Sequence, residues 1–404
     1  MTLDDLAFLT SSAGEKLLER LRREDLSEAN HLTLVTALRK EYALEQVRTA
    51  VNLALVRIKA VNKFGADAAK MFFTDEALQQ ASDPQIRQYR PSIMSPRMIA
   101  DVCCGIGSDS LAFAQAKFPV SGVDIDPIRV KMAQLNAEVL GLIEHTHFEV
   151  GDAHEISSAF GNSAIFYDPA RRDDKGNRIY DVERYIPPLS LIRGWRSMLT
   201  MVKLSPGIDL TQLRKYQVNG PEGLEFLSVE GDLKEAVLWS GVGFAHAGLD
   251  HLRGITATLL KSDEIYHWQR YHEPEIMPLS QPLGWLVEPD PSIIRAGLVQ
   301  DLAIALGGYL LDETIAYFTT DTKPESVWVR AWQILDWMPF NLKKLRAYLR
   351  ERNVGIVTVK KRGSALTPEG LTADLKLKGG ESRTLVLTRY SGQPIVIICA
   401  DYGA

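Results

Sequence analysis

The sequence is poor in cysteine, with three in 404 residues. Cys103 and Cys104 are adjacent and Cys399 stands near the end of the chain, so the spacing matches neither a zinc ligand set nor a disulfide framework. Adjacent residues of a strand face opposite sides, and Cys103 and Cys104 fall in a predicted strand. We therefore predict no metal site and a protein of the reducing cytoplasm.

The sequence also lacks a long apolar run. Its most apolar stretch, from Leu298 to Leu311, is interrupted by two polar residues and two glycines, and it is too short to cross a bilayer. The first residues, Met1-Thr-Leu-Asp-Asp, carry acids where a secretory signal carries bases. We expect neither a membrane span nor a secretory signal, which again favours a cytoplasmic location.

Positive charge is in deficit overall, with 46 Lys and Arg against 51 Asp and Glu and a formal net charge of -5. The deficit is uneven, because residues 323–404 hold 14 basic and 7 acidic residues while residues 1–322 hold 32 and 44. A basic end on an acidic body is compatible with binding a polyanion, and equally with a lysine-rich surface that only contacts water. The basic residues in question are Lys360, Lys361, Arg362, Lys376, Lys378, Arg383 and Arg389.

Length and hydrophobic periodicity divide the chain into four ranges, because 404 residues exceed one ordinary core. Residues 1–97 have apolar residues at helical spacing and predict an N-terminal helical region. Residues 98–262 alternate strand-like and helix-like segments, which predicts an α/β domain with a Rossmann-like parallel sheet. Residues 263–322 are turn-rich, and we expect a connector packed on that domain. Residues 323–404 have the order βαβαββ of a small α+β domain.

The stretch Ile99–Asp109 is predicted to form a strand, a sharp turn at Gly105 and Gly107, and the start of a helix. Glycine lets the backbone approach a ligand closely, so this turn can seat a nucleotide, although ordinary βα turns share the pattern. Three carboxylates follow at the ends of successive predicted strands. The carboxyl ends of parallel strands meet at one edge of a sheet, so we expect these carboxylates around a ligand. Each can instead be a helix cap or turn residue; they are Asp124, Asp152 and Asp168.

Two cofactors fit these features, a nicotinamide dinucleotide and S-adenosylmethionine. Ser110 stands where a dinucleotide turn needs a third glycine, and Asp109 would repel a diphosphate by about 1 kcal/mol or more at close range. S-adenosylmethionine has no phosphate, and its sulfonium and ammonium groups are cations that Asp101 and Asp109 would attract. The charge pattern therefore favours a methyltransferase over a dehydrogenase.

The sequence resembles the class I S-adenosylmethionine-dependent methyltransferases in four ordered motifs, Asp101-Val-Cys-Cys-Gly-Ile-Gly-Ser-Asp109, Val123-Asp-Ile-Asp-Pro127, Gly151-Asp152 and Asp168-Pro-Ala-Arg171. It is most similar to a bacterial group that ends in a THUMP-like, ferredoxin-like domain, through Leu233–Trp239, Glu288-Pro-Asp, Ile294–Gly297, Val359–Gly363 and Thr384–Arg389. The resemblance implies a Rossmann-like methyltransferase domain and S-adenosylmethionine as the cofactor. The cofactor-binding residues that we predict are Asp101, Cys104, Gly105, Gly107, Asp109, Asp124, Ile125, Asp152, Ala153 and Asp168.

The resemblance puts Asp168–Arg171 where related enzymes grip the acceptor amine with Asn/Asp-Pro-Pro-aromatic. This chain has Ala170 for the second proline and Arg171 for the aromatic residue, which argues against stacking of a flipped base on a ring here. The predicted catalytic residues are Asp168, Pro169 and Arg171. The Asp168 carboxylate and the Pro169 carbonyl would accept the two amine N–H bonds, and Arg171 with Arg172 would hold a phosphate or stack on a base. The alternative for the arginines is a salt bridge to Asp173 or Asp174.

The lack of cysteine also bears on the reaction. Transfer to uracil C5 usually needs a cysteine nucleophile after the fourth or fifth strand, and the sequence has none between Cys104 and Cys399. Nitrogen methylation is therefore favoured. In the THUMP-like family the terminal domain is taken to help hold RNA, so we predict tRNA or rRNA as partner and Lys360, Lys361 and Arg362 as RNA-binding residues. Two alternatives stay open: a methyltransferase for a small molecule or a protein, and a cofactor-binding protein without transfer activity.

Overall fold

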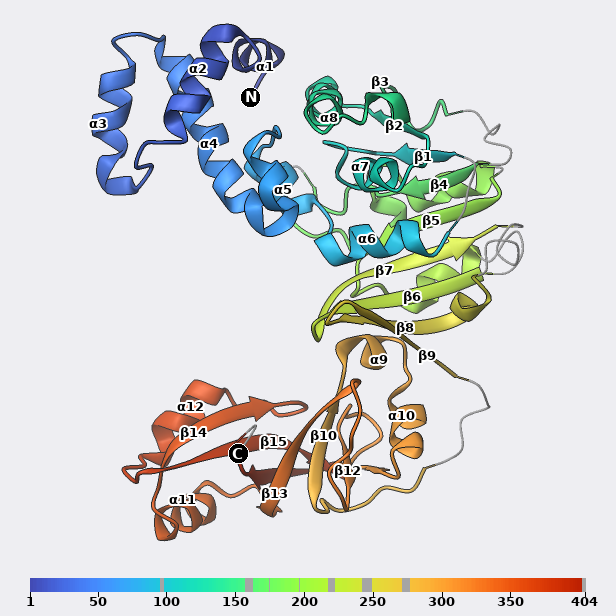
Figure 1. The fold of residues 1–404 in the computed structure, drawn as a ribbon. Helices are drawn as coiled ribbons and strands as arrows, with labels where there is room; N and C mark the ends of the chain where they lie inside the picture. Colours follow the sequence, from blue (N-terminus) through green and yellow to red (C-terminus); the bar gives the residue numbers. More distant parts are fainter. Residues whose placement is uncertain are drawn as a thin grey trace. The chain divides into compact units, whose positions relative to one another are not determined.

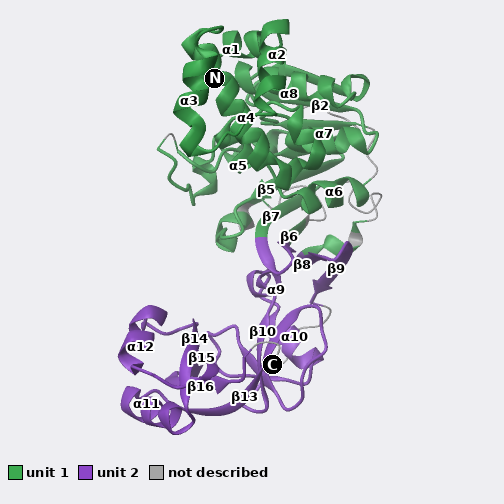
Figure 2. Ribbon diagram, turned by 60° about the vertical axis from the view of Figure 1, so that its left-hand side comes forward, with its two compact units in different colours: residues 1–225, 234–254 green, residues 226–233, 255–404 purple. Residues whose placement is uncertain are grey.

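The computed structural model describes residues 1–94, 98–156, 163–173, 175–195, 197–216, 222–241, 249–270 and 277–401. The chain forms two compact units (Figure 2). The first unit consists of residues 1–225 with 234–254, and the second consists of residues 226–233 with 255–404. Both helices and strands occur in each unit, and the fold is the mixed α/β class that the periodicity predicts.

The described part of the N-terminal region is helical, as predicted. Its helices are α1 (Leu3–Leu9), α2 (Ser12–Leu21), α3 (Glu28–Leu38), α4 (Leu44–Phe64), α5 (Asp75–Gln80) and α6 (Pro84–Ser92). Between α4 and α5, Met71, Phe72 and Phe73 are buried and belong to the core. Asn136 fixes this segment, because its amide bonds the backbone N–H and carbonyl of Phe72 and the carbonyl of Ile106. The helical region therefore reaches the glycine turn through one buried side chain.

The first sheet has the strand order β3-β2-β1-β4-β5-β7-β6-β8-β9 (Figure 1). Its parallel part consists of β1 (Ile99–Val102), β2 (Val120–Asp124), β3 (Thr146–Val150), β4 (Ala164–Tyr167) and β5 (Leu199–Leu204). Helix α7 (Ser108–Gln115) follows β1 and helix α8 (Pro127–Val139) follows β2. The strand order reverses between β1 and β4. Doubly wound sheets bind ligands at such a reversal, outside the carboxyl ends of the strands.

The remaining strands of the first sheet are β6 (Glu222–Val229), β7 (Asp232–Ser240), β8 (Gly254–Lys261) and β9 (Glu264–Gln269). Strand β7 pairs antiparallel with β5, and β9 pairs antiparallel with β8. The parallel sheet that we expected is therefore a mixed sheet, with an antiparallel extension beyond β5. The sequence pattern had identified most of these segments as strands but did not reveal their direction.

The second sheet has the order β11-β12-β10-β13-β16-β15-β14. Its strands are β10 (Trp285–Pro289), β11 (Tyr309–Leu310), β12 (Phe318–Thr320), β13 (Val329–Pro339), β14 (Val354–Lys361), β15 (Glu381–Tyr390) and β16 (Gln393–Cys399). Helices α11 (Leu342–Glu351) and α12 (Pro368–Leu375) complete the predicted βαβαββ order from β13 to β16. The range 263–322 differs from our expectation of a connector. It contributes β10, β11, β12 and the short helices α9 (Pro291–Arg295) and α10 (Val299–Ala305), and β10 pairs directly with β13.

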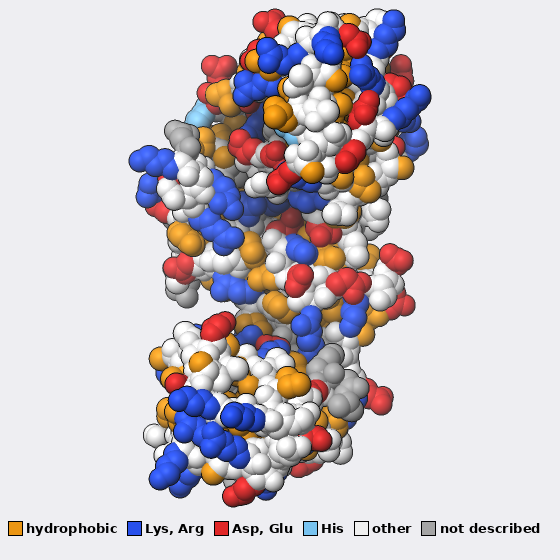
Figure 3. Space-filling view, turned by 90° about the vertical axis from the view of Figure 1, so that its left-hand side faces the viewer, with side chains coloured by type: hydrophobic (Ala, Val, Ile, Leu, Met, Phe, Trp, Pro, Cys, Tyr) orange, Lys and Arg blue, Asp and Glu red, His pale blue; other side chains and the backbone are white. Residues whose placement is uncertain are grey.

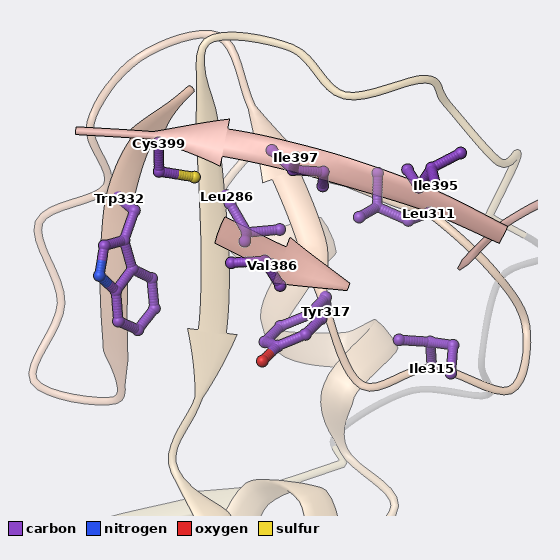
Figure 4. Packing of buried hydrophobic residues seen from close by; sticks show 9 residues of the cluster. All are labelled: Leu286, Leu311, Ile315, Tyr317, Trp332, Val386, Ile395, Ile397 and Cys399. Atoms are coloured by element: carbon purple, nitrogen blue, oxygen red, sulfur yellow. The ribbon is translucent and has the colours of Figure 1, made fainter. Parts of the chain in front are cut away.

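Hydrophobic clusters lie on both faces of the second sheet. On one face, Leu286 of β10 packs with Val386 of β15 and Ile397 of β16, all without exposed surface (Figure 4). On the other face, Leu345 and Leu349 of α11 pack on the neighbouring positions of β15 and β16. Successive strand residues point to opposite faces, so each central strand supplies both clusters.

A buried ion cluster fixes α6 against the first sheet. The side chain of Arg90 in α6 is 1% exposed and forms ion pairs with Asp109 of α7 and Glu235 of β7. Its guanidinium carbon also lies 4.7 Å from the centre of the Phe166 ring in β4. Burial opposes the charge on Arg90, but Glu235 and Asp109 outweigh it and raise the pKa of the guanidinium.

Replacing Arg90 should destabilise the protein strongly. Arg90→Met leaves the buried carboxylates of Asp109 and Glu235 without their ion-pair partner, and breaking a buried pair in this way costs about 3–5 kcal/mol. We expect a loss of that size in the free energy of unfolding, measured by urea denaturation. Arg129→Met, which removes an exposed pair with Glu76, should cost less than about 1 kcal/mol. An equal loss of unfolding free energy in the two variants would contradict the expectation that the buried ion pairs contribute more to stability than the pair of Arg129 with Glu76.

Candidate functional site

The glycine turn follows β1 directly. Strand β1 ends at Val102, so both cysteines lie in the turn and not in the strand, contrary to our expectation. Cys103, Gly105 and Gly107 have positive φ angles of 65°, 55° and 79°. A Cβ atom at Gly107 would lie 3.2 Å from the Cβ of Ala133, and the left-handed backbone there already disfavours other residues. The buried Cys104 and the turn are held by the Val123 carbonyl, which accepts from the N–H groups of both cysteines.

Asp124 ends β2 beside this turn, as predicted. Its Oδ2 accepts a 2.9 Å hydrogen bond from the Gly105 N–H, and its Oδ1 accepts one of 2.9 Å from the Asp126 N–H. The neighbouring Ile125 side chain is 71% exposed. The structure therefore brings the second-strand carboxylate and the glycine turn into direct contact, whereas sequence spacing could only suggest their proximity.

Asp152 lies on the loop after β3, which the Gly151 N–H joins to the Asp124 carbonyl at 3.1 Å. The Asp152 carboxylate accepts hydrogen bonds from the backbone N–H of His154, at 2.9 Å, and faces the His154 ring nitrogen at 2.8 Å. These bonds lower the pKa of Asp152. The next residue, Ala153, is buried. Asp152 thus remains an ionised acceptor at the same edge of the sheet as Asp124.

Asp101, in β1, carries an unusual buried carboxyl group. It is 1% exposed, its Oδ2 accepts a 2.5 Å hydrogen bond from the Ser110 hydroxyl, and its Oδ1 has no hydrogen-bond partner among the described residues. Burial, together with the negative charges of Asp109, Asp168 and Asp124, raises the pKa of Asp101 to about 8, although the Ser110 bond opposes the shift. A cation beside Oδ1 would relieve both the missing bond and the repulsion.

Asp109 corrects our electrostatic argument. We expected its carboxylate to face the ligand, but it is buried, pairs with Arg90, and accepts a 2.9 Å bond from the Ser82 hydroxyl. Although burial opposes ionisation, the charges of Arg90 and Lys203 lower the pKa of Asp109. Its negative charge is therefore already balanced inside the protein, and it gives no reason to exclude a diphosphate.

Asp168 follows β4, next to the end of β1, because its N–H donates to the Val102 carbonyl at 3.3 Å. Its side chain is 23% exposed, and its Oδ2 lies 2.7 Å from the Nζ atom of Lys203 in β5. No hydrogen bond to its Oδ1 comes from the described residues. Pro169 is buried behind it. Asp168 therefore has one oxygen fixed and one oxygen available for an acceptor group.

The residues after Pro169 form a short antiparallel arm. The backbone of Ala170 exchanges two hydrogen bonds with Ile186, at 2.8 and 3.0 Å. Arg172 donates to the Gly176 carbonyl at 2.8 Å, which differs from both roles that we considered for it. Asp173 accepts from Asn177 and Lys175, and Asp174 lies outside the described residues. Arg171 is half-buried near Tyr185, where its charge opposes the burial that raises the pKa of the Tyr185 hydroxyl.

The predicted basic cluster of the C-terminal region is divided by its contacts. Lys360 and Arg362 both pair with Glu288, at 2.6 and 3.3 Å, and they lie over the rings of Trp332 and Tyr317. Lys361, between them, is exposed. Lys360 and Arg362 are therefore engaged with Glu288 of β10 within the second unit, and their role as RNA contacts stays a prediction.

A different set of basic side chains is exposed on α11. Its sequence, Leu-Lys-Lys-Leu-Arg-Ala-Tyr-Leu-Arg-Glu, buries Leu345 and Leu349 and leaves Lys343, Lys344 and Arg350 exposed. Figure 3 shows Lys and Arg side chains gathered on the lower unit of that view. The amphipathic spacing of α11 determines this face.

Sequence reasoning missed four polar residues of the first unit that are buried around the predicted site, namely Ser82, Arg90, Lys203 and Glu235. The sequence does mark Lys203, because it lies within the apolar run Met201-Val-Lys-Leu204. Buried lysines occur mainly where they are paired, so a lysine in such a run indicates a buried acidic partner. Nothing in the sequence around the other three marks them.

In the described residues, no three His, Cys, Asp or Glu side chains gather as a metal site. Nor does any described helix have the length and apolar character needed to span a membrane.

Comparison with known proteins gives three matching family models. The model for a THUMP domain-like family matches residues 329–401, the model for RNA cap guanine-N2 methyltransferase matches residues 96–189, and a domain of unknown function matches residues 2–60. A Mycobacterium tuberculosis protein described as an uncharacterized S-adenosylmethionine-dependent methyltransferase is 30% identical over 345 residues, which is 84% of this chain and 92% of the relative. An uncharacterized RNA methyltransferase of Streptococcus pneumoniae is 30% identical over 94 residues, or 22% of this chain and 21% of the relative.

Among solved structures, a Porphyromonas gingivalis protein assigned as a methyltransferase has a similar fold. The TM-score is 0.72 at 18% identity, over 90% of this chain and 92% of that one. The similarity extends over both units, and at this identity it supports the fold alone.

The pKa of Asp101 predicts a pH dependence of stability. The native carboxyl has a pKa of about 8 against an ordinary value of 3.8, so between these values the native state binds more protons than the unfolded state. The free energy of unfolding should therefore fall as the pH rises through this window. Asp101→Asn cannot ionise, so it should lose less stability than the wild type between about pH 5 and about pH 8, by more than about 1 kcal/mol. Urea denaturation at both pH values measures this, and parallel pH profiles would contradict the shifted pKa.

Proposed function

The chain belongs to the S-adenosylmethionine-dependent methyltransferases with a C-terminal THUMP-like domain, and from this premise we propose that it methylates a nitrogen of a base in structured RNA, tRNA or rRNA. The observation that carries the proposal is the partly exposed Asp168 carboxylate after β4, next to the end of β1, with one oxygen available. Two comparisons support RNA as the substrate. The uncharacterized RNA methyltransferase of Streptococcus pneumoniae is 30% identical to this chain over 94 residues, and the RNA cap guanine-N2 methyltransferase model matches residues 96–189.

The residues around the glycine turn fit S-adenosylmethionine, which supplies an electrophilic methyl group on a sulfonium. Asp101 has an unbonded, buried oxygen that suits a cationic ammonium. Asp124 and Asp152 are carboxylates suited to accept hydrogen bonds from ribose hydroxyls and from an exocyclic adenine amine. A Cβ atom at Gly107 would crowd Ala133 and Phe148, and the left-handed backbone there favours glycine. We propose these residues, together with Cys104, Gly105, Ile125 and Ala153, as the cofactor site.

Asp168 suits the activation of an amine. An ionised carboxylate accepts an N–H bond and thereby turns the nitrogen lone pair toward the methyl group. The N–C bond forms as the C–S bond breaks, with its electron pair going to sulfur, and the proton that the nitrogen then releases passes to Asp168 or to water. The carbonyl of Pro169 is proposed to accept the second N–H bond, and Arg171 to contact the base or its phosphate.

The cysteines support nitrogen chemistry over transfer to uracil C5. Burial raises the pKa of Cys103 and Cys104 well above the usual range for a thiol, and it raises that of Cys399 to about 12. A thiolate nucleophile is therefore costly at each of the three positions. Cys399 is in addition packed within a core cluster of the second unit.

We propose the exposed face of α11, with Lys343 and Lys344, as the RNA-holding surface of the second unit. We prefer it to Lys360 and Arg362, whose charges are engaged with Glu288. Contacts between ammonium groups and phosphates supply affinity without reading sequence.

The proposal predicts methyl transfer to RNA. Total RNA from a strain that lacks the gene, incubated with labelled S-adenosylmethionine and the purified protein, should acquire label in one N-methylated nucleoside, identified by mass spectrometry. Asp168→Asn should lower the rate by about 100-fold or more, with little change in the calorimetric Kd for S-adenosylhomocysteine. Protein and metabolite fractions of the same strain are incubated in parallel: label there would favour the other acceptor classes, and absence of label in every fraction would favour a binding protein.

The surface assignment predicts a change in salt dependence. Lys343→Ala/Lys344→Ala should weaken binding to tRNA and lower the slope of log K against log salt by about one to two, since each lost phosphate contact contributes about 0.7 to 0.9. The matched control is Arg39→Ala/Lys40→Ala, which removes two exposed charges from the N-terminal helical region. Equal effects of the two pairs would mean that net charge, rather than the α11 face, determines the binding.

A further inference from the structure

Lys203 is an exceptional residue of the first sheet. It lies within β5, where every residue is buried, and its own side chain is 4% exposed. Burying an ammonium group costs several kcal/mol unless it is paired. An apolar residue of similar length would fill this space at a lower cost, so the fold alone does not explain a lysine here.

Among the described residues, the Nζ atom of Lys203 has two hydrogen-bond partners. One is Oδ2 of Asp168, at 2.7 Å, and the other is the hydroxyl oxygen of Ser82, at 2.9 Å. Ser82 lies between α5 and α6, and it donates its own proton to Asp109 at 2.9 Å. Asp109 pairs in turn with Arg90. A continuous hydrogen-bond network therefore runs from Arg90 of α6 through Asp109, Ser82 and Lys203 to Asp168.

We propose that Lys203 is a positioning residue for methyl transfer, which fixes one oxygen of Asp168 so that the other is directed to the acceptor nitrogen. The inference rests on the proposed role of Asp168. With Oδ2 bonded to the Lys203 Nζ atom, the orientation of the carboxylate is fixed, and Oδ1 is the oxygen that accepts the N–H bond of the acceptor amine. Such a group selects an N–H donor over a carbonyl oxygen, which fits an amine substrate.

The same geometry gives the N-terminal helical region a part in the reaction. Ser82 comes from that region, and without its hydroxyl the ammonium of Lys203 would lose one of its two partners. We expect Ser82→Ala to weaken the alignment of Asp168 by less than the loss of Lys203 does, since the direct ion pair remains.

A double-mutant cycle tests the inference. Single-turnover methyl transfer to the total RNA described above is measured for the wild type, Lys203→Met, Asp168→Asn and the double variant, together with the Kd for S-adenosylhomocysteine. Lys203→Met should slow transfer by about 10-fold to 100-fold and change the Kd by less than about 3-fold. In the Asp168→Asn background the same replacement should slow transfer by less than about 3-fold, because the group on which Lys203 acts has already gone.

Arg57→Met is the control for a general loss of stability. Arg57 is also a buried cation, but among the described residues it donates to the backbone carbonyls of Met71 and Lys70 and to no carboxylate. It should lower the melting temperature as Lys203→Met does while leaving the transfer rate within about 2-fold of the wild type. Additive losses in the cycle, or a rate loss in Arg57→Met as large as that in Lys203→Met, would overturn the inference while the proposed function stands. A wild type that transfers no methyl group to any acceptor overturns both.

Discussion

The pairing of one buried guanidinium governs the arrangement of the first unit. Arg90 is desolvated on α6, and its charge is stable there only because carboxylates from α7 and β7 meet it. Helix α7 begins at the glycine turn and β7 lies next to β5, so this single contact fixes the turn, the central strands and the helical region together. Phe166 of β4 closes the remaining side of the guanidinium. The ion pairs of Arg90 therefore hold the elements around the proposed cofactor site in place, although Arg90 has no proposed role in methyl transfer.

The acidic residues of the proposed site differ in whether a basic side chain pairs with them, and this difference indicates where a cationic ligand would bind. Asp109 is neutralised by Arg90, and one oxygen of Asp168 by Lys203. Asp101 has no such cation, and burial together with three neighbouring carboxylates leaves its ionisation unfavourable. The case for a cationic methyl donor therefore rests on Asp101 rather than on Asp109. Of the two carboxylates that the sequence argument named, Asp101 therefore remains the one without a paired cation among the described residues.

Local patterns identified most helices and strands of the first unit. Gly105 and Asp124 are in contact, as their spacing suggested, because a strand, a turn and the next parallel strand are short-range in topology. The polar network was not predictable in the same way, since Lys203 reaches Ser82 across 121 positions and Arg90 reaches Glu235 across 145. The pairing of Lys360 and Arg362 with Glu288 was also not predictable, because a count of charges does not show that two basic residues share one acid 72 and 74 positions away. The strands β11 and β12 hold two and three residues, too few for a periodic signal.

The composition of the second sheet has a practical consequence for anyone who dissects this chain. Strand β10 is sandwiched between β12 and β13, and its Leu286 is buried in a core cluster with Val386 and Ile397. The THUMP-like match begins only at residue 329, well after that strand. A C-terminal fragment that begins at residue 329 would lack β10 and lose the packing of Leu286. It would also expose the edge of β13 that pairs with β10, and an exposed strand edge promotes aggregation. A C-terminal fragment that keeps this sheet intact therefore begins before Trp285, the first residue of β10.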